Sequence, residues 1–219
     1  MKAMILAAGH GKRLRPLTET MPKPMIPIAS EPLIVHQIRW LQHAGISEIV
    51  INLHHLGAQI ENKLGRGADL GVHITYCHEE ELLGTGGAIV NALPHLLPGP
   101  FIVLNGDIWT NYPFKRLIQR PSATTHLVLT PKPNHRELGD FCLEDNLVRR
   151  GENNDLVFCG IGLLTEEILS HAPDDVFSIT QDLYFKRLSH NEITGEVYEG
   201  TWFDIGSHDQ LKAVRRLYL

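Results

Sequence analysis

Residues 6–18 read Leu6-Ala7-Ala8-Gly9-His10-Gly11-Lys12-Arg13-Leu14-Arg15-Pro16-Leu17-Thr18, and Pro22-Lys23-Pro24 follows four positions further on. The run begins directly after the apolar segment Ala3–Leu6, which is typical of a buried strand. Glycine carries no side chain, so a glycine-rich turn after a strand lets backbone amides approach a phosphate chain closely. The turn therefore predicts a nucleoside triphosphate site, with contacts from Ala7, Ala8, Gly9 and Gly11.

Two cations accompany this turn. Arg13 can bind phosphate oxygens in a bidentate manner, whereas Lys23 acts as a point charge. The dinucleotide fingerprint G-x-G-x-x-G needs a third glycine where this chain has Leu14, which disfavours an NAD(P)-binding oxidoreductase. The Walker A loop is also excluded, because no Gly-Lys-Ser/Thr follows at its spacing. An ordinary glycine-rich turn between a strand and a helix is the alternative.

The loop resembles the signature of the sugar-phosphate nucleotidyltransferases, which reads G-x-G-x-R-[LM]-x-P-L-T followed by P-K-P. Every one of these positions is filled over residues 9–24. An isolated Gly-x-Gly would be weak evidence, but an ordered match of this length favours the family over an ordinary turn.

Composition limits the possible classes of protein. The chain has 219 residues, of which 43% are hydrophobic, and a net charge of −5. These values predict a single α/β domain over residues 1–219 and provide no basic surplus for nucleic acid or an anionic membrane. The three cysteines form no C-x-x-C pair, and no signal peptide or long apolar run is present. We therefore expect a cytoplasmic protein with small-molecule substrates and no obligate protein partner.

The first half of the chain alternates between strand and helix patterns. Unbroken apolar runs such as Phe101–Leu104 favour a parallel sheet buried on both faces. The βαβαβαβ order predicts a Rossmann-like α/β fold whose ligands bind at the carboxyl ends of the strands. The expected strands are 3–6, 48–53, 72–77 and 101–104, and the expected helices are 32–44, 58–64 and 87–93.

The second half is less regular. Ser207 and Gln210 form a capping box that predicts the start of the last helix. We find no linker or internal repeat and expect no C-terminal hexapeptide β-helix domain before Leu219. The expected strands are 125–130, 141–144, 156–161 and 195–198, and the expected helices are 166–171 and 179–189.

Two acidic residues follow strand-like segments. Asp107 follows Phe101–Leu104 in the sequence Asn105-Gly106-Asp107, and Asp204 lies in Trp202-Phe203-Asp204-Ile205-Gly206. Mg²⁺ prefers one or two protein carboxylates together with water and phosphate oxygens. Each aspartate alone is more typical of a turn or a helix cap, but together with the phosphate loop they predict a Mg²⁺ site.

The resemblance becomes closer at Asn105-Gly106-Asp107-Ile108-Trp109-Thr110, Gly139-Asp140-Phe141 and Tyr198-Glu199-Gly200-Thr201-Trp202. Over nearly its whole length the chain is similar to the short bacterial N-acetylmuramic acid α-1-phosphate uridylyltransferases. It is similar more distantly to mannose-1-phosphate guanylyltransferases. The resemblance implies a GT-A-like Rossmann core with a mixed, mostly parallel central sheet flanked by helices. It also implies that the chain joins UTP to a sugar 1-phosphate with release of pyrophosphate, within peptidoglycan recycling.

The resemblance further implies roles for individual residues. Arg13, Lys23, Asp107 and Asp204 would be catalytic, with Arg13 stabilising the departing phosphates. Glu79, Gly84 and Thr85 would contact the nucleobase, although Glu79-Glu80-Glu81 is equally typical of a solvated acidic turn. Sugar contacts would come from Asn105, Gly139, Asp140 and Glu144. A different class, a nucleotide-sugar-binding regulatory subunit without catalysis, is disfavoured by the intact cations and acids.

Overall fold

The computed structural model describes residues 1–120, 124–134, 136–170, 172–190 and 192–218. Its main sheet contains nine strands in the order β5-β4-β1-β6-β11-β8-β12-β10-β9 within these residues. Two further sheets have two strands each, β2 with β3 and β7 with β13. The strands of the three sheets are β1 (Lys2–Leu6), β2 (Pro27–Ile28), β3 (Glu31–Pro32), β4 (Glu48–Leu53), β5 (His73–His78), β6 (Phe101–Asn105), β7 (Ile108–Thr110), β8 (Thr125–Pro131), β9 (Cys142–Glu144), β10 (Leu147–Arg149), β11 (Leu156–Leu164), β12 (Ile193–Val197) and β13 (Trp202–Asp204).

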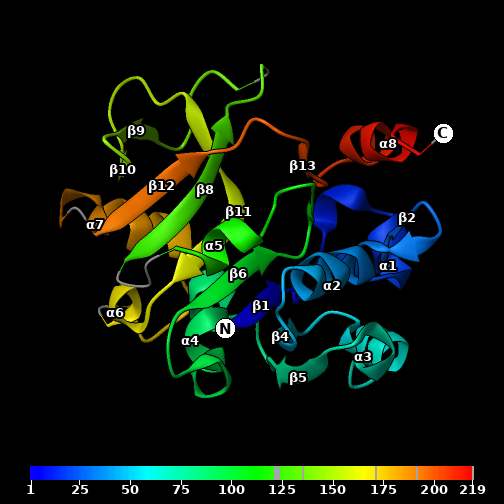
Figure 1. Cartoon of the computed structure of the whole chain (residues 1–219). Coiled ribbons are helices and arrows are strands. Elements are labelled where there is room, and N and C mark those ends of the chain that lie inside the picture. Colours follow the sequence, from blue (N-terminus) through cyan, green and yellow to red (C-terminus); the bar gives the residue numbers. More distant parts are fainter. Residues whose placement is uncertain (121–123, 135, 171, 191, 219) are drawn as a thin grey trace.

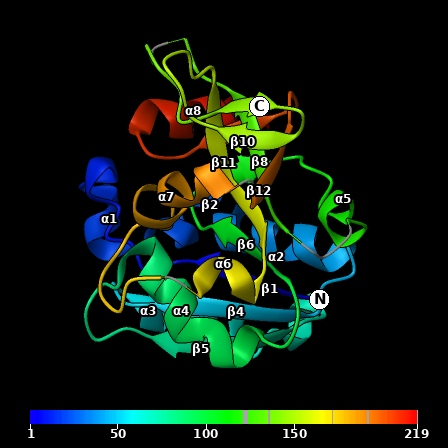
Figure 2. The ribbon, with the colours of Figure 1, turned by 90° about the vertical axis from the view of Figure 1, so that its left-hand side faces the viewer.

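The helices lie on both faces of this sheet (Figures 1 and 2). The longer ones are α2 (Leu33–His43), α3 (Gly57–Leu64), α4 (Gly84–Leu96) and α8 (His208–Arg216). The shorter ones are η1 (Lys12–Leu14), α1 (Leu17–Thr20), η2 (Lys23–Met25), η3 (Ala68–Leu70), α5 (Lys115–Ile118), α6 (Glu166–Leu169), η4 (Ile179–Tyr184), α7 (Phe185–Arg187) and η5 (Leu188–His190).

Alternation along β1 divides the core into two layers. Ala3 and Ile5 point to the face covered by α2, α3 and α5, where they pack with Ile38. Met4 points to the opposite face, which α4 and α6 cover, and packs with Ile89. Burial on both faces explains why these strands are continuously apolar.

The predicted fold class is confirmed. β1 pairs in parallel with both β4 and β6, and β4 pairs in parallel with β5. Antiparallel pairing of β11 with β6 and β8 extends the sheet and makes it mixed. The carboxyl ends of β1, β4, β5 and β6 therefore meet at one edge, where the predicted loops gather.

Most boundaries agree within a few residues. The helix expected over 179–189 is divided into η4, α7 and η5. Helix α4 begins at Gly84, earlier than expected. The helix expected over 166–171 ends at Leu169, and His171 lies outside the described residues. Sequence analysis did not predict the short strands β2, β3, β7, β10 and β13. Strands β7 and β13 pair with each other although they are distant in the chain, whereas β10 pairs with the neighbouring β9 and with the distant β12.

Helix α8, near the C-terminal end of the described chain, packs against segments of the N-terminal region that follow β1. Helix α8, red in Figure 1, packs beside the blue N-terminal segments, and Leu211 and Val214 form a small core with Leu14 and Ile28. The side chain of Ser207 caps α8 by accepting the amide hydrogen of Gln210 at 3.3 Å, as the capping box predicts. No helix among the described residues is long and apolar enough to cross a membrane.

Candidate active site

A cavity of about 430 Å³ opens at the carboxyl ends of β1, β4, β5 and β6. It brings together most of the residues predicted from sequence, although they come from four separate strand ends. The predicted residues that line it are Ala7, Ala8, Gly9, Gly11, Arg13, Lys23, Glu79, Gly84, Thr85, Asn105 and Asp107.

The loop after β1 is shaped by its glycines. Gly11 has a φ of 62°, and a Cβ added there would lie 2.9 Å from Cγ2 of Thr18, so a side chain would be strained and crowded. The Thr18 hydroxyl donates to the Gly11 carbonyl at 2.9 Å and fixes the turn. At Gly9 nothing lies within 4 Å of an added Cβ, which leaves room beside the loop for a ligand.

Arg13 reaches the cavity across a second glycine. A Cβ on Gly206 would lie 2.7 Å from a terminal nitrogen of Arg13, so glycine allows the guanidinium to lie against the backbone that follows β13. This contact places the cation of the phosphate loop beside the segment that carries Asp204. Sequence analysis did not give Gly206 a role.

The two predicted acids are brought together by the β7–β13 pair. Asp204 lies opposite Ile108 in this pair, and the Ile205 amide donates to the Asp107 carbonyl at 2.9 Å. Lys23 Nζ lies 2.6 Å from Asp107 Oδ2. Burial raises the pKa of Asp204 above its ordinary value, and the neighbouring Asp107 carboxylate raises it further, while Lys23 and Arg13 oppose the shift.

This acid pair fits a divalent cation. Oδ1 of Asp204 is buried and, among the described residues, makes no hydrogen bond. A buried carboxylate oxygen without a donor is costly, and a cation would compensate for it. The described residues contain no cluster of three or more His, Cys, Asp or Glu ligands, so the remaining positions around the cation would fall to water and phosphate oxygens, as Mg²⁺ prefers.

The opposite wall of the cavity contains a hydrogen-bonded chain of buried groups. The Ala7 amide donates to Asn52 Oδ1 at 2.8 Å, and Asn52 Nδ2 donates to the Glu79 carboxylate at 2.7 Å. The Glu79 carboxylate also accepts the Leu83 amide at 3.1 Å. Glu79 therefore ties the phosphate loop to the start of α4. Sequence analysis missed Asn52, although its position at the carboxyl end of β4 was a usable signal.

Residues Gly84 and Thr85 begin α4 at the cavity wall. The Thr85 hydroxyl accepts the Ile179 amide at 3.0 Å. Gly84 has a φ of 73°, and an added Cβ would lie 2.4 Å from the carbonyl oxygen of Phe177. The close packing of residues 177–179 on this turn explains why it requires glycine.

The structure does not bring three predicted sugar contacts, Gly139, Asp140 and Glu144, into the lining of this cavity. The Asp140 carboxylate accepts the Phe158 amide at 3.2 Å and pairs with Arg136 at 3.0 Å. Gly139 packs against the Leu156 backbone, and Glu144 is exposed on β9. The antiparallel extension of the sheet carries these residues away, and Asn105 is the member of this predicted set that lines the cavity.

The cavity brings together a glycine loop, two cations and Asp107, and Asp204, which is not among the lining residues, lies beside Asp107. This arrangement can hold a polyphosphate and neutralise charge at a reacting phosphorus. The family model described as nucleotidyl transferase matches residues 2–219, and the chain belongs to this family. The predicted family is thereby confirmed.

Individual relatives are similar over the full length of the chain. It is 40% identical over 226 residues to an N-acetylmuramate alpha-1-phosphate uridylyltransferase of Neisseria meningitidis serogroup B, covering 99% of this chain and 98% of the relative. It is 33% identical over 234 residues to a probable mannose-1-phosphate guanylyltransferase 1 of Oryza sativa subsp. japonica, covering all of this chain and 65% of that protein. A solved structure titled as a putative glucose-1-phosphate thymidylyltransferase from Bacillus anthracis has a TM-score of 0.87 at 22% identity, covers 99% of this chain and 94% of that one, and supports the fold.

Proposed function

We propose that this chain is a uridylyltransferase that converts N-acetylmuramic acid α-1-phosphate and UTP to UDP-N-acetylmuramic acid and pyrophosphate. The observation that carries the proposal is the single cavity in which Arg13, Lys23 and Asp107 meet the glycine loop. The full-length similarity to a uridylyltransferase supports the choice of substrates.

In this reaction a phosphate oxygen of the sugar phosphate attacks the α-phosphorus of UTP. The bond from that phosphorus to the oxygen bridging to the β-phosphorus breaks, and pyrophosphate leaves with the electron pair. The nucleophile is already anionic, so no general base is needed. Because two anions must approach each other, positioning and charge neutralisation supply most of the rate enhancement.

Each cation has a place in this scheme. Arg13, held against Gly206, would bind the departing β- and γ-phosphates. Lys23, paired with Asp107, would neutralise the phosphates at the reacting centre. Asp107 and Asp204 would hold Mg²⁺, which supplies Lewis-acid polarisation of the phosphoryl oxygens when bound.

The uridine base would lie against the wall formed by Glu79, Gly84 and Thr85. Each Glu79 carboxylate oxygen already accepts a hydrogen bond from a protein donor. A hydrogen bond from the base would therefore be a second one to the same oxygen. Asn105 would contact the sugar, and Gly139, Asp140 and Glu144 stay predicted contacts that would require a sugar extending beyond the cavity. We further propose a cytoplasmic enzyme acting in peptidoglycan recycling as one domain without an obligate partner.

A second candidate is mannose-1-phosphate guanylyltransferase, favoured by 33% identity to a probable enzyme of that kind. The test is a matrix of sugar 1-phosphates against UTP, GTP and dTTP, with pyrophosphate release measured. We expect UTP with N-acetylmuramic acid α-1-phosphate to give the highest kcat/KM. A tenfold preference for GTP with mannose 1-phosphate, about 1.4 kcal/mol at the transition state, would favour the second candidate. Nucleotide binding without any pyrophosphate release would indicate a regulatory subunit.

A further inference from the structure

Three histidines meet beside the phosphate loop. His10 lies between Gly9 and Gly11, both of which line the cavity. Its ring centroid is 5.5 Å from that of His54, in an edge-on arrangement, and 4.9 Å from that of His55. His54 and His55 come from the connection between β4 and α3, so the cluster joins two segments that are distant in sequence.

Backbone contacts determine the tautomers of two of these rings. His54 Nδ1 lies 2.9 Å from the Glu79 carbonyl, and His55 Nε2 lies 3.0 Å from the Thr18 carbonyl. A carbonyl oxygen only accepts, so these nitrogens carry hydrogen and donate. The other nitrogen of each neutral ring is an acceptor, which becomes a donor when the ring is protonated.

The charges around His10 favour an anionic ligand. Burial lowers the pKa of His10, and His55, His54, Lys12 and Arg15 lower it further. Two other elements contact the cluster through backbone carbonyls, the segment after β5 through Glu79 and helix α1 through Thr18. The Glu79 carboxylate itself points elsewhere and accepts hydrogen bonds from Asn52 and the Leu83 amide. Because cationic side chains surround these imidazoles, their protonated form is disfavoured in the free protein, and a bound anion would favour it.

We propose that the His10, His54 and His55 cluster is a subsite for the triphosphate chain, and that binding of a triphosphate draws a proton from solvent onto one imidazole. The inference rests on the proposed function in taking a nucleoside triphosphate as the ligand. The negative charge of the ligand would stabilise the imidazolium by Coulomb attraction, and the protonated ring would then donate to a phosphate oxygen. Lys12 and Arg15 would supply fixed charge to the same subsite.

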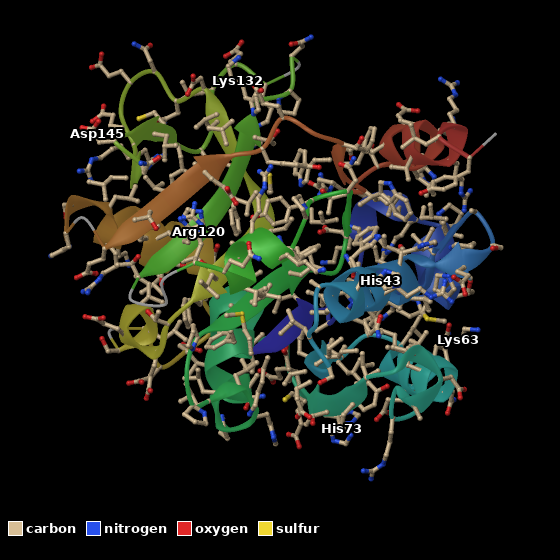
Figure 3. The ribbon with its side chains drawn as sticks, viewed as in Figure 1. His43, Lys63, His73, Arg120, Lys132 and Asp145 are labelled. Atoms are coloured by element: carbon tan, nitrogen blue, oxygen red, sulfur yellow. The ribbon has the colours of Figure 1, made fainter. Side chains whose placement is uncertain are left out.

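Isothermal titration calorimetry at pH 7 in two buffers of different ionisation enthalpy measures the protons taken up on binding. The probes are UTP and inorganic tripolyphosphate, each with Mg²⁺ present, and the proteins are wild type, His10→Gln, His55→Gln and the control His73→Gln. His73 is exposed on β5, at the end of that strand remote from Glu79 (Figure 3). Any change in the protonation of the ligand itself contributes equally with every protein. The difference in proton uptake between wild type and a variant therefore measures the contribution of the replaced imidazole.

Wild type and His73→Gln are expected to take up at least about 0.3 proton more per site than His10→Gln with both probes. We also expect His10→Gln to weaken tripolyphosphate binding about threefold or more. Equal proton uptake in wild type, His10→Gln and His55→Gln would overturn the proposal, as would a wild type that binds neither probe. His55→Gln provides the test should His10→Gln fail to fold. Proton-linked tripolyphosphate binding without any nucleotide-sugar synthesis would refute the proposed function and keep the subsite.

Discussion

Replacement of Asp204 by asparagine should separate the stability of the fold from its chemistry. Asp204 lies beside the Asp107 carboxylate, and its buried Oδ1 has no hydrogen-bond partner among the described residues. Burial and the neighbouring Asp107 carboxylate raise the pKa of Asp204, so its ionised form destabilises the metal-free fold at neutral pH. Asparagine has nearly the same shape and no charge, so the metal-free protein should gain about 1 kcal/mol in its free energy of unfolding. For a domain of this size that corresponds to a rise in Tm of about 2–4 °C.

Catalysis should change in the opposite direction. A carboxylate that holds a catalytic cation contributes several kcal/mol of charge stabilisation in the transition state. A loss of about 3 kcal/mol corresponds to a decrease in kcat/KM of roughly 100-fold. The assays are thermal unfolding with and without Mg²⁺, and pyrophosphate release. Mg²⁺ with UTP should raise the Tm of wild type but have a smaller effect on Asp204→Asn.

Asp209→Asn is a matched control, because Asp209 is an exposed acid near the start of α8 whose nearest cation is Lys212 at 3.7 Å. It should leave both Tm and kcat/KM unchanged. Full activity in Asp204→Asn would refute the metal-ligand assignment. A loss of activity together with a lower Tm would show instead that Asp204 stabilises the fold as a carboxylate.

Three further outcomes are expected. Arg13→Ala should lower kcat by about 100-fold and change KM for UTP much less, because the charge on the leaving pyrophosphate grows toward the transition state. If steady-state kinetics show only a higher KM, Arg13 binds the substrate and the transition state equally well. Burial lowers the pKa of His126 from its ordinary value of 6.5 to about 3. The stability that the neutral imidazole contributes is therefore complete above pH 6.5. It is lost as the pH falls from 6.5 toward 3, by up to about 1.4 kcal/mol per pH unit. Urea unfolding at several pH values should show a shallower acid loss in His126→Asn but not in the exposed control His43→Gln (Figure 3), and parallel curves would contradict the assignment. Asn52→Asp removes the donor to Glu79 and adds a like charge, so it should lower the free energy of unfolding by about 2 kcal/mol or more in the same assay. An unchanged free energy of unfolding would show that the buried hydrogen bonds of Asn52 add no stability.

Local signals account for the parts of the fold that could be predicted. The alternation of apolar strands and amphipathic helices over residues 1–105 encodes a parallel sheet because each element carries its own periodicity. The capping box at Ser207 and Gln210 is equally local, and it correctly marks the start of α8. The glycine loop was recognisable because its spacing is contiguous.

Non-local pairing accounts for what could not be predicted. Strands β7 and β13 have three residues each and acquire their strand conformation by pairing with each other. Strand β10 depends in part on the distant β12, where Leu147 lies opposite Thr194, and in part on the neighbouring β9. Their short sequences carry too few alternations to indicate a strand. Gly139, Asp140 and Glu144 were placed at the site through resemblance, and their contacts with the sugar stay predictions. They lie outside the lining of the cavity, because the position of the antiparallel strands depends on sheet order, which periodicity does not encode.

The same non-local pairing explains how two acids can share a site. Bringing Asp107 and Asp204 together is unfavourable, and Lys23 and Arg13 offset only part of the repulsion. The protein supplies an incomplete set of ligands for a cation, so phosphate oxygens of the nucleotide would have to complete it. The cation and the nucleotide should then bind cooperatively, since each supplies charge that the other needs, and linkage makes the effect reciprocal. Mg²⁺ should therefore bind weakly to the free protein and more tightly with UTP present, and calorimetric titrations performed in both orders should give the same coupling free energy.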